Sequence, residues 1–254
     1  MSAEELQGMC ELGQRQLIAT EYTYAQYTLM AAEKLAWELQ DWETLSRLYL
    51  PLQETRRQIR QRCLENIICL DLWPNSPADP FDREATVTRH PTGTLLVAGW
   101  GTIQTAIDVR ALQRARMQYA QTFLGAVYPI GEKGGARAVV IAPLANVTLP
   151  PATPMSIDRL IARLSPHCIV FHESQLPRGP QPPTPAATRQ IVDLWEQLHA
   201  PFLAAARQVP DPLRRMHALR RVIDVDFACE LAHQELAQLA RQISRGAQPI
   251  AANP

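Results

Sequence analysis

The sequence lacks a net charge. Among its 254 residues, 25 are lysine or arginine and 25 are aspartate or glutamate, and the two signs are close to balance in the first, middle and last parts of the chain. A nucleic-acid-binding domain usually carries a basic excess, and attraction to an anionic membrane surface also depends on one. We therefore expect no nucleic-acid or membrane partner, which leaves protein partners and small ligands.

Glycine and lysine are also scarce. The chain has 11 glycines against 21 prolines, and Lys34 and Lys133 are its only lysines. Nearly all of its positive charge is therefore on arginine, but a bias that runs through the whole chain marks no single site. The prolines occur in clusters, and clustered prolines separate elements of secondary structure.

The cysteine pattern does not fit a disulfide framework or a zinc site. The five cysteines are an odd number, and no two are spaced as Cys-x-x-Cys. A small domain held together by disulfides normally has an even number. We predict buried structural thiols at Cys10, Cys63, Cys69, Cys168 and Cys229.

Long apolar runs are absent as well. No run approaches the roughly 20 apolar residues of a membrane-spanning helix, and residues 1–5 are acidic where a signal peptide is basic. The apolar fraction of 46% and the charged fraction of 20% are typical of folded domains. These features predict a folded cytoplasmic protein.

The sequence is instead organised in blocks separated by prolines. Behind a Ser-x-x-Glu capping box at Ser2, the first block has apolar residues at three-and-four spacing, which predicts helices. The last block has the same period, with helix starts at Thr184-Pro185 and Asp211-Pro212. The predicted organisation is an N-terminal helical hairpin (1–72), a Pro-rich linker (73–91), a Rossmann-like α/β core (92–180), C-terminal helices that pack on the core (181–245) and a disordered tail (246–254).

The middle block combines short apolar runs with one long amphipathic segment. The runs at 94–100, 137–142 and 167–172 predict buried strands, the segment 102–127 predicts a helix, and 156–164 predicts a short capped helix. Continuous apolar strands joined through a helix are typical of a parallel βαβ unit. The predicted fold class is α/β: a small Rossmann-like parallel sheet of about three or more strands, flanked by N-terminal and C-terminal helical hairpins.

Part of the first block resembles a known helical repeat. Ala32 and Ala36 on a first helix, Asp41 at a turn and Tyr49 on a second helix resemble one tetratricopeptide-type hairpin over residues 29–57. No second copy follows at the 34-residue period of that family, and no family resemblance covers the whole chain. The resemblance implies an interaction surface for a peptide or protein partner, with no catalytic role.

Two short segments at the ends of predicted strands are candidates for ligand binding. In an open parallel sheet, ligands bind beyond the carboxyl ends of the strands, and glycines before a helix let backbone amides approach a phosphate. The alternatives are that the glycines only permit a tight turn and that the second segment only begins a polar loop. The candidate residues, for a nucleotide or another small anion, are Gly99, Gly101, Thr102, His172, Glu173 and Ser174.

Two Glu-x-x-His pairs occur in the last block. On a helix this spacing puts the carboxylate and the imidazole on one face, and two such pairs with two further glutamates form di-iron or di-manganese sites in four-helix bundles. The alternative is that these side chains lie on solvated or partly buried helix faces. The candidate metal ligands are Glu196, His199, Glu230 and His233.

Strong catalytic motifs are missing from the sequence: it has no nucleophile elbow, no P-loop and no complete dinucleotide fingerprint. We therefore predict a non-catalytic interaction or scaffold module that binds a protein partner through its N-terminal helices. One alternative is an enzyme or sensor that binds a nucleotide or small anion at the strand ends, and a second is a helical di-metal carboxylate site. No residue is assigned a catalytic role, and no cofactor is indicated.

Overall fold

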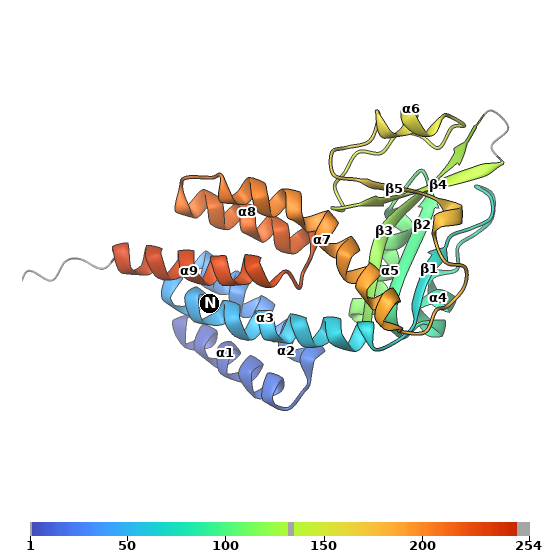
Figure 1. The fold of residues 1–254 in the computed structure, drawn as a ribbon. Helices are drawn as coiled ribbons and strands as arrows, with labels where there is room; N and C mark the ends of the chain where they lie inside the picture. Colours follow the sequence, from blue (N-terminus) through green and yellow to red (C-terminus); the bar gives the residue numbers. More distant parts are fainter. Residues whose placement is uncertain (1, 132–134, 248–254) are drawn as a thin grey trace, which may run out of the picture. The chain divides into compact units, whose positions relative to one another are not determined.

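The computed structural model describes residues 2–131 and 135–247 (Figure 1). The chain forms two compact units. An α/β unit comprises residues 60–198, and a helical unit is built from the two ends of the chain, residues 1–59 and 199–254.

The α/β unit is built around a five-stranded sheet. Its elements, in chain order, are the end of α3 (Trp42–Leu64), β1 (Ile68–Leu72), α4 (Arg83–Arg89), β2 (Thr92–Trp100), α5 (Gln104–Ala115), β3 (Tyr119–Ile130), β4 (Ala136–Ala142), α6 (Ile157–Ile161), β5 (Ile169–His172), the 3-10 turn η1 (Glu173–Gln175) and the first part of α7 (Pro185–Arg207). The strand order is β1-β2-β3-β4-β5; β1 to β3 are parallel, and β4 is antiparallel to both of its neighbours. This architecture confirms the predicted α/β class and is consistent with a Rossmann-like fold.

The prediction of a single helix over residues 102–127 is wrong, because α5 ends and β3 begins within that segment. Phe123 and Val127 have the spacing of a helical face, but every residue from 121 to 128 is buried, as in a strand covered on both faces. Met117 turns the chain between the two elements in a left-handed conformation, with φ of 52°. The spacing of the apolar residues is therefore compatible with a helix and with a strand. The continuous burial of residues 121–128 fits the strand.

The predicted parallel pairing of the strand at 137–142 is also wrong. This strand is β4, which runs antiparallel to β3, because the five residues 131–135 that join the two strands are too few for a crossover connection. The parallel βαβ unit is β2-α5-β3 instead. A further parallel strand, β1, forms where residues 68–72 were predicted to continue a helix.

The sheet is buried on both faces. On one face Val97 packs with Val87 of α4 and Val109 of α5. On the other face Phe123 stacks on Trp195 of α7, with ring centroids 4.2 Å apart. Such an aromatic pair contributes about 0.5–1.5 kcal/mol beyond its buried area. The start of α7 is therefore a structural layer of the α/β unit.

The helical unit is formed by α1 (Ala3–Ile18), α2 (Tyr22–Glu38), the first part of α3, the last part of α7, α8 (Pro212–Val225) and α9 (Glu230–Ala247). The predicted helix starts are confirmed: Ser2 and Glu5 form the reciprocal capping box, and Asp211 accepts from the amide of Arg214 at 2.7 Å. The first block contains three helices where a two-helix hairpin was predicted. The buried core of this unit includes Leu29, Ala36, Leu45, Tyr49, Met216, Leu219 and Leu236.

α1 and α2 approach each other closely at Gly13. A Cβ atom added there would lie 2.5 Å from Cδ2 and 2.7 Å from Cγ of Leu29, and Leu29 is fully buried. A Cβ atom added at Gly8 of the same helix would have nothing within 4 Å. Packing therefore requires the small residue at position 13 and not at position 8.

Two further predictions concern the membrane and the C-terminus. No described helix is long and apolar enough to cross a membrane. Residues 246 and 247 of the predicted disordered tail belong to α9. The rest of that tail, from residue 248 onward, lies outside the described residues.

We expect opposite effects from Gly8→Ala and Gly13→Ala. The first should raise the free energy of unfolding by about 1 kcal/mol, because alanine is the better helix former. The second should lower it by about 1–3 kcal/mol, because the methyl group overpacks against Leu29. Urea unfolding of both variants checks this, and a Gly13→Ala protein as stable as Gly8→Ala would contradict the close packing of α1 on α2.

Candidate functional site

The six predicted ligand-binding residues lie at one edge of the sheet, in two separate groups. β2 and β5 run in the same direction, so their carboxyl ends share that edge. β3 and β4 lie between them, and three strand spacings amount to about 14 Å. The edge thus holds a glycine turn, Gly99 to Thr102, and a polar turn, His172 to Ser174.

The amides of the glycine turn are used within the chain. The Gly99 amide donates to the Thr102 carbonyl at 3.2 Å, and the Gly101 amide donates to the Val127 carbonyl at 3.0 Å. Gly101 has a positive φ of 61°, and a Cβ atom there would lie 2.8 Å from Cβ of Ala152. This geometry favours the tight-turn alternative, since neither amide points to an open space where a phosphate would bind.

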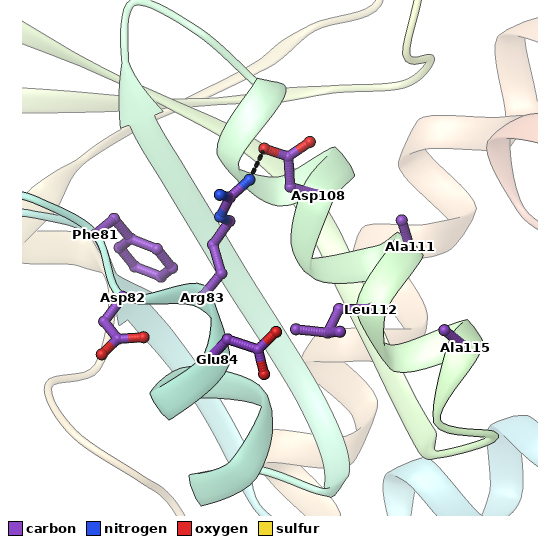
Figure 2. Close-up of a pocket in the computed structure, with 8 residues that line it drawn as sticks. All are labelled: Phe81, Asp82, Arg83, Glu84, Asp108, Ala111, Leu112 and Ala115. Carbon is purple, nitrogen blue, oxygen red and sulfur yellow. Dashed lines mark hydrogen bonds and ion pairs between the residues drawn. The ribbon is translucent and has the colours of Figure 1, made fainter.

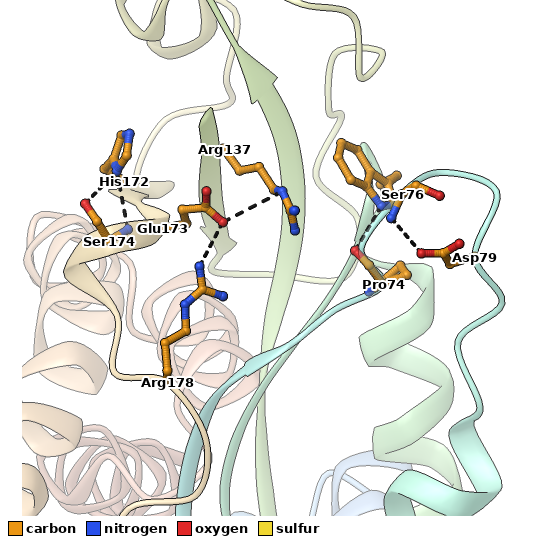
Figure 3. A network of polar contacts seen from close by, with 9 residues as sticks. Pro74, Ser76, Asp79, Arg137, His172, Glu173, Ser174 and Arg178 are labelled. Carbon is orange, nitrogen blue, oxygen red and sulfur yellow. Dashed lines mark hydrogen bonds and ion pairs between the residues drawn. The ribbon is translucent and has the colours of Figure 1, made fainter. Parts of the chain in front are cut away.

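His172 and Ser174 of the polar turn bond to each other. Nδ1 of His172 lies 2.7 Å from Oγ of Ser174 and accepts from the Ser174 amide at 3.3 Å (Figure 3). In return, the His172 amide donates to the side chain of Gln175 at 2.7 Å. These reciprocal bonds cap η1, so the imidazole and the hydroxyl have a local structural role.

Glu173, between them, belongs to a different set of contacts that the sequence did not predict. Its Oε2 accepts from Nη2 of Arg178 at 3.1 Å and lies 3.7 Å from Nε of Arg137 (Figure 3). The Arg137 guanidinium lies 5.9 Å from the ring centroid of Trp100, and that of Arg178 lies 5.7 Å from that of Trp73. Both separations are within the range of cation–π attraction. We call these five residues the Trp-Arg cluster.

The members of the Trp-Arg cluster are far apart in the sequence. Trp73 follows β1, Trp100 ends β2, Arg137 begins β4, and Glu173 and Arg178 follow β5. No fixed spacing relates them, so neither periodicity nor a motif could have grouped them. The one signal in the sequence was the position of Trp100 and Glu173 at strand ends, where ligands commonly bind.

The four predicted metal ligands do not converge. Glu196 and Glu230 are exposed, His199 is mostly buried and His233 is fully buried. Nδ1 of His199 lies 2.8 Å from Oδ2 of Asp226, so its partner is a side chain outside the predicted set. Over residues 2–131 and 135–247, no group of three or more histidine, cysteine, aspartate and glutamate side chains is placed to hold a metal ion.

The two histidines are instead held in opposite charge states. Burial and the positive charge of Arg56 lower the pKa of His233 to about 3. Its Nε2 accepts from Nη1 of Arg56 at 2.8 Å, and its Nδ1 donates to the Cys229 carbonyl at 2.7 Å. Burial also lowers the pKa of His199, but its bonds to Asp226 and Cys229 outweigh that effect and raise it to about 10. At neutral pH His199 is a cation and His233 is neutral.

A groove of about 590 Å³ lies between α4 and α5 (Figure 2). Phe81 and Leu112 are its larger apolar side chains, and Nη1 of Arg83 donates across it to Oδ2 of Asp108 at 2.6 Å. Asp82 caps α4, and Glu84 pairs with Arg116 outside the groove. The polar groups of the groove therefore either cap α4 or join α4 to α5, and none of the predicted site residues lines it.

Tyr24, Tyr27 and Met30 form an exposed stripe on α2, which we call the α2 face. Tyr27 is 71% exposed, Tyr24 53% and Met30 45%. Residues three apart are neighbours on a helix surface, so the three side chains adjoin one another. The opposite side of α2 is fully buried, at Ala25, Leu29, Ala32 and Ala36.

Comparison with known proteins finds no matching family model, no matching curated protein and no matching solved structure. Function is therefore inferred from the contacts, burial and charge of the side chains. Among the described residues, the α2 face and the Trp-Arg cluster are the surface features considered below.

We expect Asp226→Asn to lower the pKa of His199 well below about 10, because burial is then opposed by Cys229 without the help of the carboxylate. The folded pKa of His199 is above the unfolded value of about 6.5. The protonated His199 therefore stabilises the folded state fully below a pH of about 6.5. This contribution to the free energy of unfolding is lost as the pH rises through about 10. The stability advantage of the wild type over Asp226→Asn should shrink accordingly between pH 7 and 10.

Histidine ring NMR signals and urea unfolding at several pH values measure both effects. His233 is the internal control, since its pKa of about 3 leaves its ring signal unchanged between pH 5 and 8. A His199 signal that still titrates near pH 10 in Asp226→Asn would refute the assigned role of the carboxylate.

Proposed function

We propose that the protein is a non-catalytic interaction module and that the α2 face binds its protein partner. The exposure of Tyr24, Tyr27 and Met30 on one side of a well-packed helix carries this proposal. Single exposed apolar residues are ordinary on protein surfaces, but adjoining aromatic and apolar ones mark interaction sites.

The composition of the α2 face suits protein recognition. Tyrosine buries a large, rigid ring at a small cost in side-chain entropy, and its hydroxyl group can bond at the rim of an interface. Lys34, further along the same helix and mostly exposed, pairs with Glu38 at 3.9 Å, so the charges beside the face are balanced. A partner with apolar anchoring side chains and a polar rim fits this surface.

The helix that presents this face is held rigidly. Nε1 of Trp37 donates to the hydroxyl oxygen of Tyr49 at 2.9 Å, which joins α2 to α3. Asp41 accepts from both the amide and the hydroxyl of Thr44, at 2.9 and 2.7 Å, and so caps α3 at the turn. A rigid surface loses less entropy on binding than a mobile one.

The polar groups at the ends of β2 and β5 support a non-catalytic role, because they are used in local structure. The amides of the glycine turn and the His172 and Ser174 side chains take part in turns and caps. A catalytic role would require such groups to face a substrate.

A photo-crosslinking residue at position 27 tests the proposal. In extracts of cells that contain the protein, we expect Tyr27→benzoylphenylalanine to form a discrete adduct with one partner protein. The matched control is the same residue at Gln238, an exposed position within α9. Adding Tyr24→Ser and Met30→Ser should weaken adduct formation about 5- to 30-fold, the loss expected when anchor side chains are removed from an interface.

Circular dichroism and thermal unfolding should show that the serine variants stay folded, because the replaced side chains are exposed. The absence of an adduct at position 27, or equal adducts at positions 27 and 238, would refute the assignment of the α2 face.

A further inference from the structure

We propose that the Trp-Arg cluster binds a ligand through a single carboxylate group. This site lies in the α/β unit and is independent of the function proposed for the α2 face. It is a second binding site, of a different chemical class, at the edge of the sheet where the parallel strands end.

The cluster has an excess of one positive charge. It contains the guanidinium groups of Arg137 and Arg178 and the single carboxylate of Glu173. The nearby acids Asp71 and Asp79 accept from the amides of Gly179 and Ser76, at 2.8 and 3.0 Å, and keep their negative charges. These carboxylates would repel a ligand with a single negative charge less than a dianion.

Arg137 has unused hydrogen-bonding capacity. Its side chain is only 25% exposed, yet its ion pair with Glu173, at 3.7 Å, is longer than a hydrogen bond. Within the described part of the chain, the structure gives it no hydrogen bond, although a guanidinium has five N–H donors. Among the described residues, no nitrogen of Arg137 is both buried and without a partner, so water reaches these donors and a ligand oxygen would replace that water.

The two tryptophans hold the guanidinium groups in place. Nε1 of Trp100 donates to the Pro74 carbonyl at 3.3 Å, which fixes the ring that faces Arg137. Trp73 is only 9% exposed and faces Arg178. The apolar rings also lower the local dielectric constant, which strengthens a bond between a guanidinium and an anion.

Glu173 shows which anion the cluster accepts. Its carboxylate already lies between the two arginines, and only its Oε2 oxygen has a bond or ion pair to them. A planar guanidinium matches a carboxylate through two parallel N–H···O bonds, a geometry that Arg137 does not reach with Glu173. A ligand carboxylate would make those bonds and compete with Glu173 for both arginines.

Acetate is the probe for this site. It would be titrated into the protein in place of chloride at constant ionic strength, with NMR detection of the Trp100 indole N–H and the Arg137 Nε–H. We expect saturable shifts of both signals, with a Kd of the order of 1–10 mM for so small an anion.

Glu173→Gln and Arg137→Gln should change the affinity in opposite directions. Glu173→Gln removes the competing carboxylate and should tighten acetate binding about tenfold, and Arg137→Gln should weaken it at least tenfold. Arg178→Gln, in an exposed loop, should also weaken binding and is the second variant if Arg137→Gln does not fold. The matched controls are Glu43→Gln and Arg47→Gln, an exposed ion pair at 2.6 Å on α3, which should leave the shifts unchanged.

Equal acetate shifts in the wild type, Arg137→Gln and Arg178→Gln would overturn the site. An unchanged affinity in Glu173→Gln would overturn the competition with Glu173. Stronger binding of inorganic phosphate than of acetate would overturn the carboxylate assignment. None of these results depends on the α2 face, so failure here is distinguishable from failure of the protein-interaction proposal.

Discussion

Burial of β2 and β3 on both faces dictates the layout of the α/β unit. Successive side chains of a strand point to opposite faces, so Phe123 and Leu124 need covering layers on opposite sides of the sheet. Right-handed crossovers, the rule for parallel strands, place α4 and α5 together on the Leu124 side. The Phe123 side is covered by α7, through Trp195. This is why the first part of α7 belongs to the α/β unit, although its last residues belong to the helical unit.

Because both faces of the sheet are covered by apolar side chains, charged side chains lie at the ends of its strands. Arg137 and Glu173 lie at the carboxyl edge, where the strands end and the chain turns back. The helical unit meets the same constraint differently: its helices bury one side, and α2 leaves Tyr27 and its neighbours exposed on the other. The two proposed binding sites therefore lie in different units, one at the carboxyl ends of the strands and one on an exposed side of a helix.

The paired Glu-x-x-His motifs show how far local spacing can mislead. Both motifs put a glutamate and a histidine one turn apart on a helix, as predicted. Their surroundings differ, because His199 pairs with Asp226 and His233 pairs with Arg56, which is 177 residues away in the chain. One imidazole is therefore charged and the other neutral. Identical spacing gave opposite electrostatics, because a pKa depends on neighbours in space.

Local chemistry was enough to predict the helix starts at Ser2 and Asp211 and the α/β class, because caps and apolar periodicity depend on residues within about one turn or one strand. It was not enough to separate α5 from β3, since an apolar spacing of four fits a helix and a strand buried on both faces equally well. Strand direction, the partners of the histidines and the meeting of Arg137 with Glu173 depend on contacts between distant segments. Only the folded chain brings those segments together, so only the tertiary structure could reveal them.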